Sequence, residues 1–314
     1  MKLNRWKILL LYLLPTTFYF LPAYALGSRN DVGTSGAQFL KLGVGARPAG
    51  MGEAYSAVAD DIFTTYYNPA GLAEFTRPQV GGMHNQYFQS IRHEFASFAV
   101  PLREGQRGTL AVSIYNLGIS DIERRGTTET DTPSETFDSS DLAYALSYGL
   151  KLNDRLSLGT TLKYIDQTLD GVHATALGAD VGSLYRWETS SVALGVRNLG
   201  SKTKFHVDSS PLPMVLFAGL SQRLSSNLLF AADLNIPRDN RIGFGAGTEF
   251  NHSFFEGLSA ALRAGYNSRN SDPGGLSGIS IGAGMTYQQL GFDFAWVPFG
   301  DLGNTFRYSL LLKF

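Results

Sequence analysis

Residues 305–314 read TFRYSLLLKF. Large apolar side chains take every second position of this stretch, namely Phe306, Tyr308, Leu310, Leu312 and Phe314. Three of the four positions between them are polar: Arg307, Ser309 and Lys313. Alternation with a period of two predicts a β-strand with one face in an apolar medium and the other in water. Because a membrane-crossing strand needs about 9–11 residues, the stretch favours a membrane strand; the last strand of a secreted sandwich is the alternative.

The beginning of the chain predicts a secretory signal peptide over residues 1–25. Three cations precede an apolar run over residues 8–21, and small residues of an A-x-A cleavage site follow at 23–25. We expect cleavage after Ala25. No later apolar run approaches the roughly 18 residues that a spanning helix needs. If the mature chain lies in a membrane, it must therefore cross as a closed β-barrel.

The composition agrees with a barrel and argues against several other classes. Charged residues make up 17% of the chain, below the roughly 25% of soluble domains. Without the three leader cations, the 26 basic residues fall to 23 against 27 acidic ones, so no basic excess indicates a nucleic-acid partner. The chain has no cysteine, which argues against a small disulfide-stapled secreted scaffold.

Residues 79–314 contain fourteen candidate strands of an antiparallel sheet. Their expected ranges are 79–90, 92–101, 109–118, 141–151, 157–169, 173–186, 191–199, 214–224, 228–236, 241–250, 258–268, 278–288, 291–298 and 305–314. Alternation alone does not separate a barrel in lipid from a soluble sheet with a dry core. Connection lengths do separate them, because one side has short turns and the other has longer polar loops at 120–140, 200–213 and 269–275. The sequence therefore predicts an all-β fold, a 14-stranded transmembrane β-barrel.

Residues 26–78 differ from the strands that follow. They are rich in glycine and alanine and lack long alternation. In an eight-stranded barrel, side chains alone can fill the lumen. A barrel of fourteen strands has a wider lumen that side chains alone do not fill. We expect residues 26–78 to fold into that lumen as a hatch, or plug.

The hatch region carries a specific resemblance. Residues 36–47 (GAQFLKLGVGAR), 50–55 (GMGEAY), 59–61 (ADD) and 67–72 (YNPAGL) resemble the opening of the PorV/PorQ family, which belongs with the FadL-like outer-membrane barrels. The resemblance implies a 14-stranded barrel with an internal hatch. It assigns a hatch turn to Asn68, Pro69, Ala70 and Gly71, and a glycine-rich lead-in to Gly43, Val44, Gly45 and Ala46. Turn formation alone, with no functional role, is the simpler reading of these residues.

The final strand resembles the C-terminal signal by which such barrels are recognised by the barrel-insertion machinery. That resemblance assigns the insertion signal to Phe306, Tyr308, Leu310, Leu312 and Phe314. It also implies the outer membrane, with its lipid, as the location.

No catalytic constellation, metal site or cofactor motif stands out, and we expect no enzyme activity. The five histidines, His84, His93, His173, His206 and His252, lie on different expected strands and loops without ligand spacing. The glycines at 243, 245 and 247 lack the strand–turn–helix context of a dinucleotide site; inside a strand they would let the hatch approach the wall. Asp60 and Asp61 suit a helix cap or a hatch-to-wall salt bridge better than a cation site.

Two functions fit this fold. The PorV/PorQ resemblance implies a barrel of type IX secretion that receives cargo bearing C-terminal signal domains, with partner contacts in the external loops 119–140 and 200–213. The alternative is FadL-like passive uptake of hydrophobic small molecules. Its expected feature is an apolar pocket between the barrel wall and hatch residues Phe63, Tyr66 and Tyr67, for which plain packing of the hatch is the simpler explanation.

Overall fold

The computed structural model describes residues 31–103, 105–128, 130–205, 207–270 and 276–314. The predicted signal peptide and its cleavage site at Ala25 lie outside these residues. The strands are β1 (Gln79–Gln86), β2 (Arg92–Pro101), β3 (Thr109–Arg124), β4 (Glu135–Lys151), β5 (Leu156–Leu169), β6 (Val172–Trp187), β7 (Ser190–Gly200), β8 (Lys202–Phe205), β9 (Asp208–Pro211), β10 (Val215–Arg223), β11 (Leu228–Pro237), β12 (Gly243–Phe255), β13 (Leu258–Asn267), β14 (Ile279–Tyr287), β15 (Leu290–Pro298) and β16 (Asn304–Lys313). The short helices are η3 (Gln38–Lys41), α2 (Ala46–Gly50), α3 (Thr64–Tyr67), η4 (Pro69–Glu74), η5 (Ser268–Asn270) and η6 (Gly300–Leu302).

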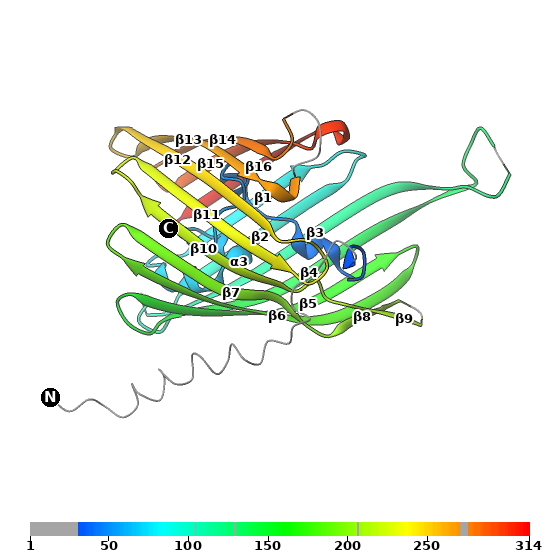
Figure 1. The fold of residues 1–314 in the computed structure, drawn as a ribbon, viewed down its shortest axis with the longest axis horizontal. Helices are drawn as coiled ribbons and strands as arrows, with labels where there is room; N and C mark the ends of the chain where they lie inside the picture. The colour runs from blue at the N-terminus through cyan, green and yellow to red at the C-terminus, as the bar shows by residue number, and fades with distance from the viewer. Residues whose placement is uncertain (1–30, 104, 129, 206, 271–275) are drawn as a thin grey trace, which may run out of the picture.

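Fourteen of the strands form one closed antiparallel barrel, as the sequence predicts (Figure 1). β1 closes the sheet against β16, with a continuous register from Gln79 opposite Lys313 to Gln86 opposite Phe306. Closure pairs the backbone of the first strand with that of the last, so no sheet edge is left open along the wall. No helix among the described residues has the length and apolar character needed to cross a bilayer.

Two connections differ from the predicted loops. The connection between β7 and β10 folds into the separate hairpin β8–β9, and the predicted loop 119–140 is largely strand, because β3 runs on to Arg124 and β4 starts at Glu135. Figure 1 shows β3 and β4 extending well beyond the barrel at the end where β8 and β9 also lie. The long connections therefore gather at one end, which we call the long-loop end, opposite the short turns.

The alternation of the final strand places its large apolar side chains outside the barrel. Phe306, Tyr308 and Leu310 are 40, 40 and 54% exposed, whereas Arg307 and Ser309 are each 2% exposed. Outward-facing leucines, valines and aromatics recur on the other strands of the barrel. An apolar exterior over a polar inner wall is the pattern of a barrel in lipid and the reverse of a soluble sandwich.

Candidate functional site

The turn at residues 68–71 is buried against inward-facing residues of β4, β5 and β6. The Asn68 side chain accepts a hydrogen bond from the Ala70 backbone N–H (3.1 Å) and donates to the carbonyls of Ser56 (2.9 Å) and Ser183 (3.2 Å). Pro69 follows as the first residue of η4, where its missing N–H costs no helical hydrogen bond. Asn68 thus caps a helix and ties the N-terminal segment (residues 31–78) to β6.

This turn rests on a row of glycines that runs across three neighbouring strands. Gly149 on β4 lies opposite Gly159 on β5, which lies opposite Gly182 on β6. A Cβ atom on Gly159 would overlap the backbone of Pro69 and Ala70, and one on Gly149 would lie 2.7 Å from the Ala73 nitrogen. Only glycine permits such an approach of two backbones. The row was not predicted, because it becomes visible only when the strand register is known.

A second backbone contact joins residues 50–52 to the opposite part of the wall. Added Cβ atoms on Gly245, Gly247 and Gly265 would each overlap the backbone of Met51 or Gly52. The sequence predicts this approach at glycines 243, 245 and 247. The contacts show it at Gly245 and Gly247, whereas an added Cβ on Gly243 would meet the side chain of Arg269 instead.

The lead-in at residues 43–46 is held by the inward-facing side of the last strand. Arg307 donates from Nη1 to the Gly43 carbonyl (3.0 Å), and the Ala46 N–H donates to Ser309 Oγ (2.7 Å). Gly45 adopts a positive φ of 85°, which favours glycine, and Val44 is fully buried. The outward side of this strand carries the predicted insertion signal; at its end the Phe314 ring stacks on Phe98 with centroids 6.4 Å apart.

Arg47 is the centre of a buried ion-pair network. Its guanidinium contacts Asp60 (2.5 Å) and Asp61 (3.0 Å) of the same segment and Glu249 of β12 (2.7 Å). Glu249 also pairs with Arg263 of β13 at 2.6 Å. We expected Asp60 or Asp61 to form a salt bridge with the wall. Instead, both pair with Arg47, and Arg47 forms the salt bridge with Glu249 of the wall. Asp61 also accepts a hydrogen bond from the Phe63 N–H (3.0 Å), but α3 has no side-chain cap.

A second ion-pair group lies nearer the long-loop end. Glu53 contacts Arg307 of β16 at 3.1 Å and Arg269 of η5 at 2.7 Å. Burial alone would raise the pKa of Glu53, but the two guanidinium groups lower it below its ordinary value. Glu53 is thus ionised and fixed between two wall cations.

The aromatic residues proposed for a pocket are packed tightly. Phe63, Tyr66 and Tyr67 are at most 5% exposed. The ring centroids of Phe63 and Phe95 on β2 are 5.8 Å apart, and those of Tyr66 and Tyr115 on β3 are 6.3 Å apart. These rings fill the space between the N-terminal segment and the wall, and a pocket that opens there stays a prediction.

The leading part of the N-terminal segment reaches the long-loop end. Lys41 pairs with Asp239, in the β11–β12 connection, at 2.9 Å, and Gln38 donates to the same carboxylate at 2.7 Å. The Gly36 N–H donates to the carbonyl of Pro211 in β9 (3.0 Å). Burial alone would raise the pKa of Asp239, yet the hydrogen bonds from Gln38 and Lys41 lower it below its ordinary value.

Replacing Asp239 with asparagine is expected to loosen residues 35–41 without unfolding the barrel. A hydrogen bond to a charged group contributes about 1.5–3 kcal/mol, so the local opening free energy should fall by about 2 kcal/mol. Because the pKa of Asp239 is lowered, its contribution is complete above the ordinary aspartate pKa and is lost as the pH falls through the lower folded value. Hydrogen exchange of residues 35–41 measures the change; unchanged protection would contradict the assigned contacts.

The histidines that the structure describes lie on different strands, and His206 is outside the described residues. His84 on the outer face of β1 bonds Glu94 of β2 at 2.6 Å, and His173 lies near Asp166 at 3.5 Å. His93 is fully buried beside Tyr87. Among the described residues, no three His, Cys, Asp or Glu side chains come together as metal ligands.

Solved structures that share this architecture include a toluene transporter and a FadL homologue. The chain matches the toluene transporter TbuX of Ralstonia pickettii with a TM-score of 0.58 and 13% identity, over 86% of this chain and 97% of that one. It matches a FadL homologue of Pseudomonas aeruginosa with a TM-score of 0.57 and 11% identity, over 86% and 98%. These identities show a shared fold. Among curated proteins, none is significantly similar in sequence to this chain.

The family comparison is more specific. Residues 27–194, more than half of the chain, match the model of the type IX secretion system protein PorV. With the closed barrel and its apolar exterior, this match places the protein in the outer membrane. The chain is a member of the PorV family of FadL-like outer-membrane β-barrels.

Proposed function

We propose that the protein serves type IX secretion as a barrel that receives cargo bearing C-terminal signal domains. The match of residues 27–194 to the PorV family model carries the proposal. The shape of the long-loop end supports it, since the β3–β4 extension and the β8–β9 hairpin project there beyond the wall (Figure 1). We propose these two hairpins, within residues 119–140 and 200–213, as the partner contacts.

In this proposal, residues 26–78 act as a hatch that keeps the lumen closed. The two glycine contacts, the Arg47 network and the Glu53 ion pairs all hold the described part of this segment against the wall. Large buried side chains such as Tyr67 and Phe63 fill the space between this segment and the wall. Cargo would therefore be handled at the external face rather than through the lumen.

Deleting the gene tests the proposal directly. We expect proteins with C-terminal signal domains to accumulate in the periplasm of the deletion strain. Complementation with the full chain should restore their secretion. Normal secretion in the deletion strain, together with impaired uptake of long-chain or aromatic compounds, would instead favour a channel.

Passive uptake of hydrophobic molecules is the second candidate. It is favoured by the fold shared with the toluene transporter TbuX and by the apolar aromatic cluster of Phe63, Tyr66 and Tyr67 in the lumen. In this case the N-terminal segment must shift, because the three rings are buried against the wall.

A disulfide between the N-terminal segment and β1 tests whether secretion requires the hatch to move. An ideal Cβ on Gly81 lies 3.7 Å from the Ile62 Cβ, within the about 3.5–4.5 Å that a disulfide spans, and the chain has no other cysteine. The variant Ile62→Cys/Gly81→Cys should secrete cargo normally when oxidised. Loss of secretion on oxidation, restored by reductant and absent from either single-cysteine variant, would contradict a fixed hatch.

The final strand should serve assembly rather than either function. We propose that Phe306, Tyr308, Leu310, Leu312 and Phe314 are read by the barrel-insertion machinery before the wall closes. The pairing of this strand with β1 supports the proposal, because it completes the barrel.

A further inference from the structure

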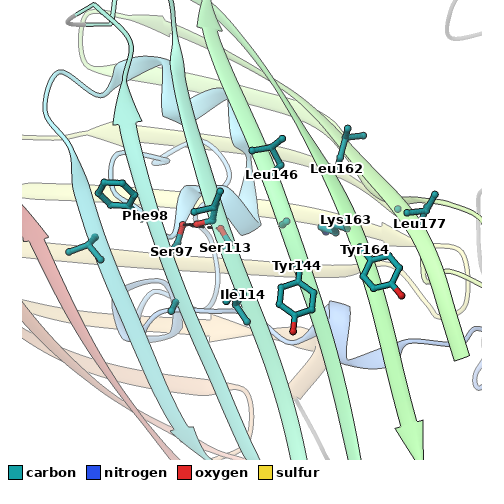
Figure 2. Close-up of a pocket in the computed structure, with 15 residues that line it drawn as sticks. Ser97, Phe98, Ser113, Ile114, Tyr144, Leu146, Leu162, Lys163, Tyr164 and Leu177 are labelled. Atoms are coloured by element: carbon teal, nitrogen blue, oxygen red, sulfur yellow. Dashed lines mark hydrogen bonds between the residues drawn. The ribbon is translucent and has the colours of Figure 1, made fainter. Parts of the chain in front are cut away.

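The outer wall has an apolar hollow on the lipid-facing side of β1–β6. It has a volume of about 720 Å³ and is lined on the outside by side chains that include Val80, Ala96, Phe98, Ile114, Tyr144 and Tyr164. Figure 2 shows the apolar side chains standing on the outer side of the strands. A convex barrel would not have this indentation, so its cause must lie in the side chains.

The outward side chains become smaller from β5 toward β1 along one row of paired residues. Gly82 on β1 lies opposite Ala96 on β2, and Ala96 lies opposite Ile114 on β3. The same row continues through Tyr144 and Tyr164, which are directly opposite each other on β4 and β5. A row that falls from two tyrosines to an alanine and a glycine leaves room for a hydrocarbon chain against the wall.

The tyrosines give the hollow a polar side. Both hydroxyls point toward the end of the wall at which β5 ends, which is the long-loop end (Figure 2). Tyrosine rings take this position at the boundary between acyl chains and head groups. The hollow therefore belongs to the leaflet nearer the long-loop end, which is the outer leaflet in barrels of this kind.

A separate polar pocket lies farther along β1 and β2, toward the long-loop end. The outward positions that follow Gly82 on β1 are His84 and Gln86. These two side chains line a pocket of about 580 Å³ together with Gln89, Ser90, Arg92, Ser120 and Asp121. None of the ion pairs among the described residues includes Arg92, whose guanidinium makes one long hydrogen bond to Ser120 (3.4 Å). Arg92 can therefore offer paired N–H donors to a phosphate, with the Asp121 carboxylate in the same pocket.

We infer that the hollow and the polar pocket form one binding site for a phosphorylated glycolipid of the outer leaflet. Its acyl chains lie in the hollow beside Ala96, its sugar contacts the amides and hydroxyls of the pocket, and one phosphate contacts Arg92. The site goes beyond the secretion and channel proposals, because it is on the outside of the wall and depends on neither.

The position of the site favours a lipid over a protein partner. The hollow is continuous with the apolar band that already faces the bilayer, and hydrocarbon is the material that fills a depression there. The Arg92 guanidinium above the hollow supplies charge complementarity to an anionic head group.

Lipid retention in two variants tests the inference. Ala96→Phe fills the hollow, and Arg92→Gln removes the cation while keeping a polar side chain. Ala264→Phe on β13 is the matched control, since it makes the same change at an outward position away from the hollow. Purified protein in nanodiscs would be mixed with lipid A, phosphatidylglycerol and phosphatidylethanolamine, and bound lipid counted by native mass spectrometry.

We expect the wild type and Ala264→Phe to retain lipid A, and each site variant to retain about tenfold less. All four proteins should show the same heat-modifiable electrophoretic mobility, which reports a folded barrel. Equal retention by Ala96→Phe, equal loss in Ala264→Phe, or stronger retention of either phospholipid than of lipid A would each overturn the inference. A dimer that Ala96→Phe dissociates would assign the hollow to a second copy instead.

Discussion

Replacing Arg47 with alanine is expected to release the N-terminal segment from β12 and to destabilise the folded barrel by about 3–5 kcal/mol. The guanidinium, 15% exposed, is the shared partner of Asp60, Asp61 and Glu249. Without it, the Asp61 and Glu249 carboxylates, 1% and 2% exposed, are left buried beside the partly exposed Asp60. Breaking a buried ion pair from one side costs more than the pair contributes, because the remaining charges stay buried.

Denaturant titration of heat-modifiable mobility and protease cleavage within residues 31–78 measure this effect. Arg124→Ala is the control, because Arg124 pairs with Asp170 at 2.5 Å on the surface, where a pair contributes about 0–1 kcal/mol. A stability change in Arg47→Ala as small as in the control would show that the network does not hold the segment.

Acid should reduce the difference between Arg47→Ala and the wild type. Burial alone would raise the pKa of Asp60, but Arg47 lowers it below its ordinary value. In the wild type the contribution of this pair is therefore complete above the ordinary pKa of about 3.9 and is lost as the pH falls through the lowered one. In the variant, acid neutralises carboxylates that repel one another. Titrations at pH 7 and at pH 3, which is below the ordinary pKa, should show a smaller stability difference at pH 3.

The wall could be predicted from the sequence because its signals are local. Alternation of the kind in residues 305–314 repeats with a period of two, and the predicted ranges 92–101 and 258–268 match β2 and β13 within one residue. Outward and inward faces follow from the same pattern, since Phe306 is exposed and Arg307 is buried. Connection lengths then distinguished a barrel in lipid from a soluble sheet.

Features that depend on pairing across the chain could not be predicted in this way. The polar loop 120–140 has the composition of an external connection, yet β3 and β4 continue to pair through it as far as Arg124 opposite Glu135. Arg47 contacts Glu249 across about two hundred residues, and a single sequence contains no signal for that pair. Asp60 and Asp61 were identified as charged partners of a salt bridge, but Arg47 was not.

The row formed by Gly149, Gly159 and Gly182 also depends on strand pairing and could not be predicted from the sequence. A substitution in this row has the second large expected effect. Gly159→Val should displace the turn at residues 68–71 from the wall. The new Cβ would overlap the backbone of Pro69 and Ala70, and two backbones cannot separate by a side-chain rotation. Overpacking of a tight core costs about 1–3 kcal/mol and occasionally more. We expect the upper part of this range or beyond, because Asn68 would also lose its bonds to Ser56 and Ser183.

The matched control is Gly118→Val on β3, where an added Cβ has no heavy atom within 4 Å. Valine suits a strand better than glycine, so this control should be at least as stable as the wild type.

If the N-terminal segment closes the lumen, Gly159→Val should also raise ion conductance in planar bilayers, because an emptied barrel of fourteen strands is wide enough for water and ions. Lost stability with unchanged conductance would mean that the segment stays in place and the wall deforms instead. Unchanged stability and conductance together would show that the turn does not rest on Gly159, and the hatch proposal would lose one of its backbone contacts with the wall.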